Sequence, residues 1–134
     1  MEDPETIRRV VTDMVHAVNR GAFAEATSCF SGEPLIVEDI APFRWDGTSA
    51  VADWLSAMGA NAASLGASLI EMTLHPVERL EIQANCSYAC FPGTLRMSVT
   101  GGELHAKGVL TLVLVKDSSR WLIDILVWSG SRPQ

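Results

Sequence analysis

The stretch that decides the fold is Leu104–Trp128, which reads LHAKGVLTLVLVKDSSRWLIDILVW. It contains two long runs of β-branched and other apolar residues, and Asp117-Ser118-Ser119 between them has the composition of a turn. The pattern predicts two long antiparallel strands, Leu104–Lys116 and Trp121–Trp128, joined as a hairpin.

The chain before this hairpin also has a period of two. We predict further strands at about Leu69–Leu74, Val77–Gln83 and Ser87–Val99. Turn residues separate the later ones, at Ala84-Asn85 and at Gly101-Gly102. Together with the hairpin, these segments predict a β meander that occupies the C-terminal half of the chain.

The N-terminal part has helical periodicity instead. Asp3 suits an N-cap, Pro4 suits the first helical position, and Gly21 ends the predicted helix. Between them, apolar residues recur every three or four positions and form one stripe: Ile7, Val10, Val11, Met14, Val15 and Val18. A short second helix is predicted after Gly21, with Phe23 and Phe30 on one side.

A strand, a loop and a third helix connect the two halves. Leu35–Val37 is predicted to be a short strand, and Ile40–Gly47 a loop. A third helix follows, capped by Thr48 or Ser49. The resulting order is α-α-β-α followed by a β meander, which predicts the α+β class with helices segregated from a mostly antiparallel sheet.

Composition limits the possible functions. The chain has 134 residues, which predicts one domain over 1–134. Its net charge of −6 disfavours nucleic acid and an anionic membrane surface as partners. The longest apolar stretch, Val109–Val115, is far too short to span a membrane, and the acidic N-terminus has no secretory signal, so we expect a cytoplasmic protein. Its three cysteines are expected to be free thiols.

Two segments carry a resemblance to a known family. One is Val37-Glu38-Asp39 with the following loop and helix, and the other is the closing pair of long strands. Both are similar to the nuclear transport factor 2-like superfamily, and to its SnoaL-like branch in particular. The resemblance implies three helices on the concave side of a strongly curved antiparallel or mixed sheet, around a conical pocket.

The resemblance leaves several functions open. It implies either a cofactor-free, metal-free acid/base enzyme acting on a lipophilic carbonyl compound or epoxide, or a non-catalytic ligand-binding or dimerisation module. Isomerases, cyclases, dehydratases and epoxide hydrolases all resemble this pattern. An accessory subunit that meets a different protein is a third interpretation.

Asp39 is the first candidate catalytic residue. It lies where ketosteroid isomerases, in a similar V-E-D segment, have their general base, and polyketide cyclases of the SnoaL type resemble this arrangement. Phe43, Trp45 and Trp54 are expected to desolvate its carboxylate and so to raise its pKa. The alternative is that Asp39 accepts backbone N–H groups in the following turn.

The rest of the isomerase pattern is absent. The position that matches the isomerases' helix tyrosine is Met14, and Leu104–Val115 contains no acid, so steroid isomerisation by that mechanism is not expected. Asp124 is the second candidate, since alternation places it on one face with Trp128; the alternatives are a bulge that returns it to solvent, or pairing with a basic residue across the sheet. Tyr88 is a candidate donor to a ligand carbonyl, or else it satisfies its hydroxyl locally.

Large apolar side chains are expected to form the pocket wall. The candidates are Met14, Phe43, Trp45, Trp54, Met58, Phe91 and Trp128. No metal-ligand spacing occurs, so no metal or cofactor is expected. Both faces of the last two strands are apolar, and helices cover only one face of such a sheet. An exposed apolar sheet of this size predicts an interface, and we expect a homodimer through the outer face.

Overall fold

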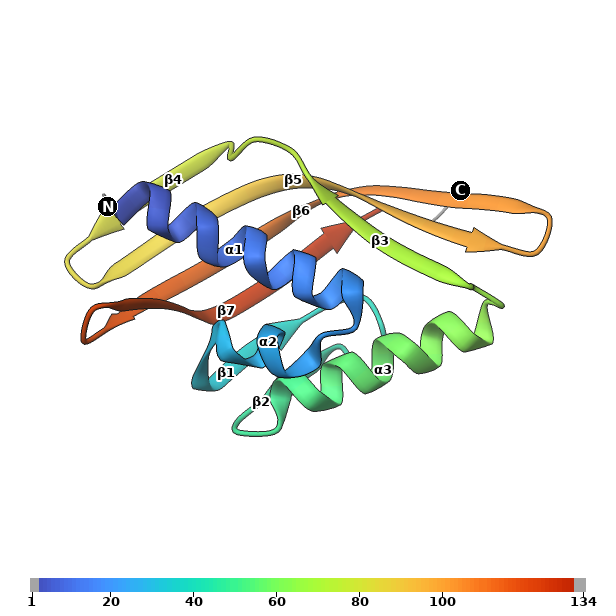
Figure 1. The fold of residues 1–134 in the computed structure, drawn as a ribbon, viewed down its shortest axis with the longest axis horizontal. Helices are drawn as coiled ribbons and strands as arrows, with labels where there is room; N and C mark the ends of the chain where they lie inside the picture. The colour runs from blue at the N-terminus through green and yellow to red at the C-terminus, as the bar shows by residue number, and fades with distance from the viewer. Residues whose placement is uncertain (1–2, 132–134) are drawn as a thin grey trace.

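The computed structural model describes residues 3–131 and consists of helices packed on one sheet (Figure 1). The helices are α1 (Asp3–Arg20), α2 (Phe23–Ser28) and α3 (Ala50–Ser64). The strands are β1 (Phe30–Val37), β2 (Arg44–Asp46), β3 (Leu69–Leu74), β4 (Arg79–Gln83), β5 (Cys86–Val99), β6 (Gly102–Asp117) and β7 (Arg120–Gly130). The predicted α+β class is confirmed.

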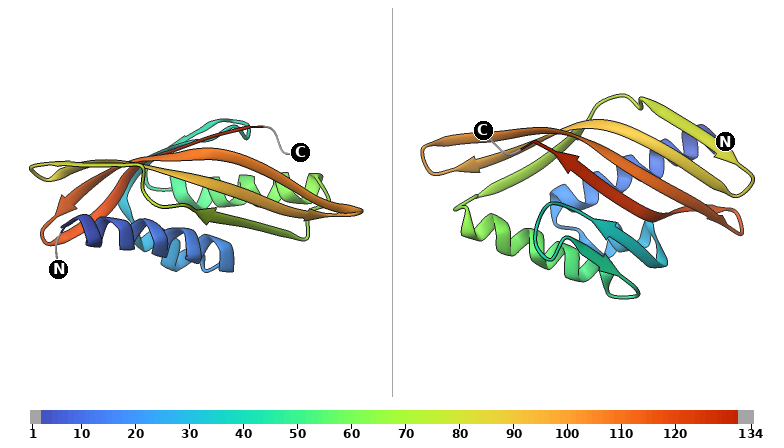
Figure 2. Two further views of the ribbon diagram at one scale, coloured as in Figure 1. Left: turned by 90° about the horizontal axis from the view of Figure 1, so that it is seen from above. Right: turned by 180° about the vertical axis from the view of Figure 1, so that it is seen from behind.

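The sheet is mixed and curved. Its strand order is β2-β1-β7-β6-β5-β3, and β4 pairs with a further part of β5. The β1–β7 pair is parallel, and the other pairs are antiparallel. All three helices lie on one side of the sheet, as the view from above shows (Figure 2). The opposite face therefore carries no helix of the described chain.

Helix α1 lies on the sheet through its apolar stripe. Ile7 and Val11 are fully buried, and Met14 is 2% exposed. The start of the helix is tied to the far end of the hairpin, because the Asp3 carboxylate accepts a hydrogen bond from Trp121 Nε1 at 3.1 Å and another from Lys116 Nζ at 3.4 Å. The burial of the stripe and these two bonds set how α1 lies across the strands.

A β-bulge in β7 changes which residues face the helices. The register shifts so that Val113 pairs with Ile125 and Leu114 pairs with Ile123, which leaves Asp124 as the extra residue. Because of this insertion, Ile123 and Leu126 both lie in the core, although simple alternation puts them on opposite faces. The prediction that Asp124 shares a face with Trp128 is therefore wrong.

The other differences from the predicted elements are local. Phe30 begins β1 and does not belong to the second helix, so the first strand starts earlier than predicted. The predicted loop contains the short strand β2, whose Trp45 pairs with Ile36. All three cysteines are free, as predicted. No helix within residues 3–131 has the length and apolarity needed to cross a membrane.

Candidate functional site

A cavity of about 810 Å³ lies between the helices and the concave face of the sheet. This volume lies within the range of small-molecule sites. Most of its wall is apolar and comes from α1, α3 and the long strands: Met14, Trp54, Met58, Leu95, Met97, Leu110, Leu126 and Trp128. Its polar side chains are few: Asn19, Glu38, Asp39, Asn61, Ser68 and Ser131. We call this space the main cavity.

Glu38 is the acid in the main cavity whose ionisation is most perturbed. Its side chain is partly buried, and its Oε1 accepts a hydrogen bond from Trp54 Nε1 at 3.3 Å. Burial among apolar groups raises the pKa of Glu38 from 4.5 to about 7; the bond from Trp54 opposes this rise and the charge of Asp39 adds to it. Glu38 therefore exists in both protonation states near neutral pH.

The local backbone explains why Glu38 points inward. Ile36 is fully buried on the concave face, and Glu38 is two residues further along the chain. The backbone N–H of Glu38 donates to the carbonyl of Phe43 at 3.1 Å, which continues the β1–β2 pairing past the last strand residue. Alternation therefore extends to Glu38 and places it on the same side as Ile36.

Asp39, the residue singled out from the sequence, has a different environment. It lines the main cavity beside Glu38, but its side chain is exposed. The desolvation that we predicted for Asp39 applies to its neighbour instead. Parity with the buried Ile36 was the signal in the sequence that pointed to Glu38.

The other two predicted catalytic residues lie outside the main cavity. Asp124, at the bulge, accepts a hydrogen bond from Ser31 Oγ at 2.7 Å. Tyr88 is 40% exposed, and the Arg79 guanidinium lies 5.4 Å from its ring centroid. Tyr88 alternates with the buried Ser87 and Ala89, so it occupies the face that the helices do not cover. The structure therefore does not bring Asp39, Asp124 and Tyr88 together.

The predicted wall residues divide into three groups. Met14, Trp54, Met58 and Trp128 line the main cavity. Phe91 lines a different cavity, beside α1. Two residues line neither cavity: Phe43 is 57% exposed, and Trp45 is packed in the core at 7% exposure. Whether the four lining residues contact a ligand stays a prediction.

A pair of glycines allows Trp128 to form part of the wall. Gly108 and Gly130 are cross-strand partners in β6 and β7. A Cβ atom built on Gly108 comes within 2.4 Å of the Ser129 carbonyl oxygen and 2.7 Å of the Trp128 ring. One built on Gly130 comes within 2.9 Å of Trp128 Nε1. The indole therefore lies directly over both glycines, at a distance that no other residue type permits.

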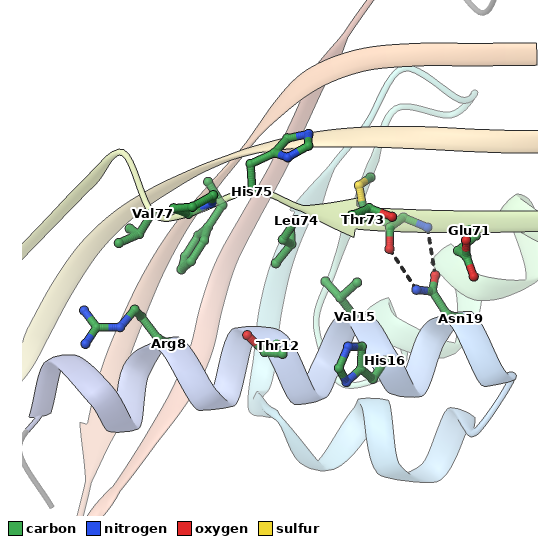
Figure 3. Close-up of a pocket in the computed structure, with 13 residues that line it drawn as sticks. Arg8, Thr12, Val15, His16, Asn19, Glu71, Thr73, Leu74, His75 and Val77 are labelled. Carbon is green, nitrogen blue, oxygen red and sulfur yellow. Dashed lines mark hydrogen bonds between the residues drawn. The ribbon is translucent and has the colours of Figure 1, made fainter.

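A second cavity, of about 510 Å³, lies between α1 and β3 (Figure 3). Two hydrogen bonds form the partition between it and the main cavity: Asn19 Nδ2 donates to the Met72 carbonyl at 2.9 Å, and the Met72 N–H donates to Asn19 Oδ1 at 3.0 Å. Both residues line both cavities. Because β3 is an edge strand, this amide also satisfies backbone groups that lack a neighbouring strand. We call this second space the α1–β3 groove.

Metal-binding side chains do not cluster in the described chain. Residues 3–131 contain no group of three or more His, Cys, Asp or Glu placed to hold a metal ion. The titratable chemistry of the main cavity therefore rests on Glu38 and Asp39, the two carboxyl residues in its lining.

Solved structures show which fold this is. The chain superposes on hexachlorocyclohexane dehydrochlorinase LinA-type3 from Novosphingobium barchaimii with a TM-score of 0.81 at 13% identity, over 98% of this chain and 88% of that one. A proposed scytalone dehydratase from Novosphingobium aromaticivorans gives a TM-score of 0.81 at 11% identity, over 98% and 86%. A proposed dehydratase of the nuclear transport factor 2-like family from Streptomyces avermitilis gives 0.79 at 15% identity, over 97% of both chains.

The chain has the nuclear transport factor 2-like fold. The predicted cone, with three helices on a curved mixed sheet, is therefore confirmed. No protein-family model and no curated protein matches the sequence itself. Identities of this size establish the fold alone, since a single fold carries many activities.

Proposed function

We propose that this nuclear transport factor 2-like protein binds a lipophilic small molecule in the main cavity and moves a proton on its carbon skeleton through the Glu38 carboxyl. The observation that carries the proposal is a carboxyl group that projects into an apolar cavity of ligand size and is held by Trp54. A pKa of about 7 supports it, since an efficient general base titrates near the working pH.

The chemistry of the cavity favours elimination within this class. The Glu38 carboxylate removes a proton from carbon, the C–H electron pair forms a double bond, and a leaving group departs from the adjacent carbon with its bonding pair. No Lys, Arg or His side chain lines the main cavity within the described chain, so a free carbanion has no cation to stabilise it. A concerted loss of water or halide fits this environment better, and the fold neighbours named above include dehydratases and a dehydrochlorinase.

The second candidate is a non-catalytic ligand-binding protein. The bond from Trp54 to Glu38 ties α3 to the end of β1, and this contact is also reasonable as a structural element. Under this reading Asp39, Asp124 and Tyr88 have structural or solvation roles only. The two candidates differ in one respect: ligand binding without a base survives the loss of the Glu38 charge.

A general probe of carbon-bound base strength tests the proposal without the natural substrate. We use 5-nitrobenzisoxazole, which opens to a nitrile and a phenolate when a base removes its ring C–H proton and the N–O bond breaks. We expect the wild-type protein to accelerate this opening, with a rate that rises through pH 7 as Glu38 loses its proton. Glu38→Gln should lower the rate about 100-fold, a typical contribution of one general base.

Asp39→Asn is the matched control, because it removes the same charge from the adjacent residue. It should leave the rate within a few-fold of wild type. Equal rates for wild type and Glu38→Gln, with the probe still bound as judged by thermal shift, would favour the non-catalytic candidate. A rate that is lost only in Asp39→Asn would transfer the base to Asp39.

We further propose that the protein forms a homodimer through the uncovered sheet face. Cross-strand pairs build two rows across four strands of this face, and we call them the outer rows. One row is Leu35, Ile125, Val113 and Tyr88, and the other is Val37, Val127, Thr111 and Cys90. The helices lie on the opposite side (Figure 2). A contiguous apolar surface of this kind is characteristic of an interface.

A charge placed in the outer rows should separate the dimer. Val113→Lys puts an unpaired ammonium at the centre of the proposed interface, where its burial is strongly unfavourable. We expect light scattering to give a dimer mass for wild type and a monomer mass for Val113→Lys. Ile82→Lys, at an exposed apolar position of β4 outside the rows, is the control and should stay dimeric. A monomeric wild type would overturn this proposal.

A further inference from the structure

The α1–β3 groove is the second space of ligand size in this protein, with a volume of about 510 Å³. Four apolar side chains form much of its lining: Val15, Leu74, Val77 and Phe91. Figure 3 shows Val15 rising from α1 toward the strand and Leu74 descending toward the helix. A lining of this kind suits the hydrocarbon part of a small molecule.

Arg8 is the unusual residue of the groove. It is partly buried, and within residues 3–131 it has neither an ion pair nor a hydrogen bond. The other two partly buried cations are both paired: Arg96 with two glutamates, and Lys116 with an aspartate. Arg9 and Lys107 also have no ion pair, but they are exposed and hydrated. Arg8 alone is thus partly withdrawn from water without compensation.

The neighbours of Arg8 extend the same argument. Thr12 is one helical turn further along α1 and lines the same groove, so its hydroxyl lies on the same side of the helix. Glu71 is the carboxylate in the lining, and Arg96 Nη2 lies 3.1 Å from its Oε1, so its charge is already compensated. Glu71 lies near Asn19, at the other end of the groove from Arg8 (Figure 3). One end therefore has an unpaired cation and a hydroxyl, and the middle is apolar.

We propose that the α1–β3 groove binds a monocarboxylate with an apolar body, an aryl or alkyl carboxylate, distinct from whatever occupies the main cavity. The guanidinium of Arg8 pairs with the carboxylate through two parallel N–H donors, the geometry in which arginine binds carboxylates most strongly. Thr12 donates a further hydrogen bond, and the apolar body lies along Val15 and Leu74. The Asn19–Met72 partition keeps this ligand out of the main cavity. The proposal does not depend on the function of Glu38.

The test compares an acid with its uncharged analogue. 3-Phenylpropionate and 3-phenylpropionamide share one hydrocarbon body, and their binding is followed by NMR. The backbone amide of Thr73 reports on the groove, and the indole N–H groups of Trp54 and Trp128 report on the main cavity. We expect the acid to shift the Thr73 signal and leave both indole signals unchanged. The amide should bind about tenfold more weakly, because it cannot pair with Arg8.

Two variants with the same change in net charge complete the experiment. Arg8→Gln should weaken binding of the acid about tenfold, whereas Arg9→Gln, the exposed neighbour on the same helix, should bind it as wild type does. Equal loss in both variants would show a general charge effect and overturn the proposal. Unchanged binding in Arg8→Gln, or shifts confined to the two indole signals, would overturn it as well.

Discussion

Glu38→Gln is expected to be more stable than wild type at pH 8, by up to about 3 kcal/mol, and equal to it at pH 4. Burial raises the pKa of Glu38 from 4.5 to about 7, so the folded state binds more protons than the unfolded state between these values. The free energy of unfolding of wild type therefore falls as the pH rises through this window and levels off above about pH 7. A shift of this size corresponds to about 3 kcal/mol, which a neutral glutamine avoids.

Urea denaturation at several pH values measures this difference. Asp39→Asn again supplies the matched control: its side chain is exposed, so its stability should follow that of wild type closely across the range. If the stabilities of Glu38→Gln and wild type differ by the same amount at every pH, the Glu38 carboxyl is not desolvated in the folded protein. A gain in stability together with a loss of base catalysis is typical of functional residues.

Gly108→Ala should destabilise the protein by about 3 kcal/mol, the upper end of the usual range for overpacking. The new methyl group meets the Ser129 carbonyl oxygen at 2.4 Å and the Trp128 ring at 2.7 Å. Backbone of the neighbouring strand cannot move without breaking the β6–β7 pairing, and Trp128 has to leave the cavity wall. The free energy of unfolding from urea denaturation gives the stability, and thermal shift with a bound ligand reports on the cavity.

Gly59→Ala is the control for Gly108→Ala. Gly59 lies inside α3, and nothing lies within 4 Å of a Cβ atom built there. Alanine should stabilise this helix by about 0.5–1 kcal/mol, since it reduces the backbone entropy that is lost on folding. If Gly108→Ala is as well tolerated as Gly59→Ala, Trp128 does not lie over the glycine pair.

The sequence was sufficient for most of the fold. Periodicity predicted Leu69–Leu74 with the bounds that the structure has, and it found the long hairpin because its two strands and its turn differ in composition. Phe30 was placed wrongly because β1 begins two residues after α2 ends, with no breaker between them. Where local signals were present, the order of elements was enough to indicate the fold.

The candidate site was harder to predict because it depends on pairing between strands. Glu38 points inward because its N–H continues the β1–β2 pairing, and that partner was invisible in the sequence, where the second strand was taken as a loop. Asp124 was assigned to the wrong face because both faces of β7 are apolar, so no alternation marks the extra residue of the bulge. Tyr88 likewise needed the sheet to reveal that it faces away from the helices.

The most direct test of the central claim is the titration of Glu38 itself. Carbon-13 NMR of the side-chain carboxyl, assigned by comparison with Glu38→Gln, follows its protonation across the pH range. A midpoint near 7, which moves when a lipophilic ligand enters the main cavity, is the result that this account predicts. A midpoint near 4.5, unaffected by ligand, would mean that Glu38 is an ordinary solvated acid and would contradict its role as the base.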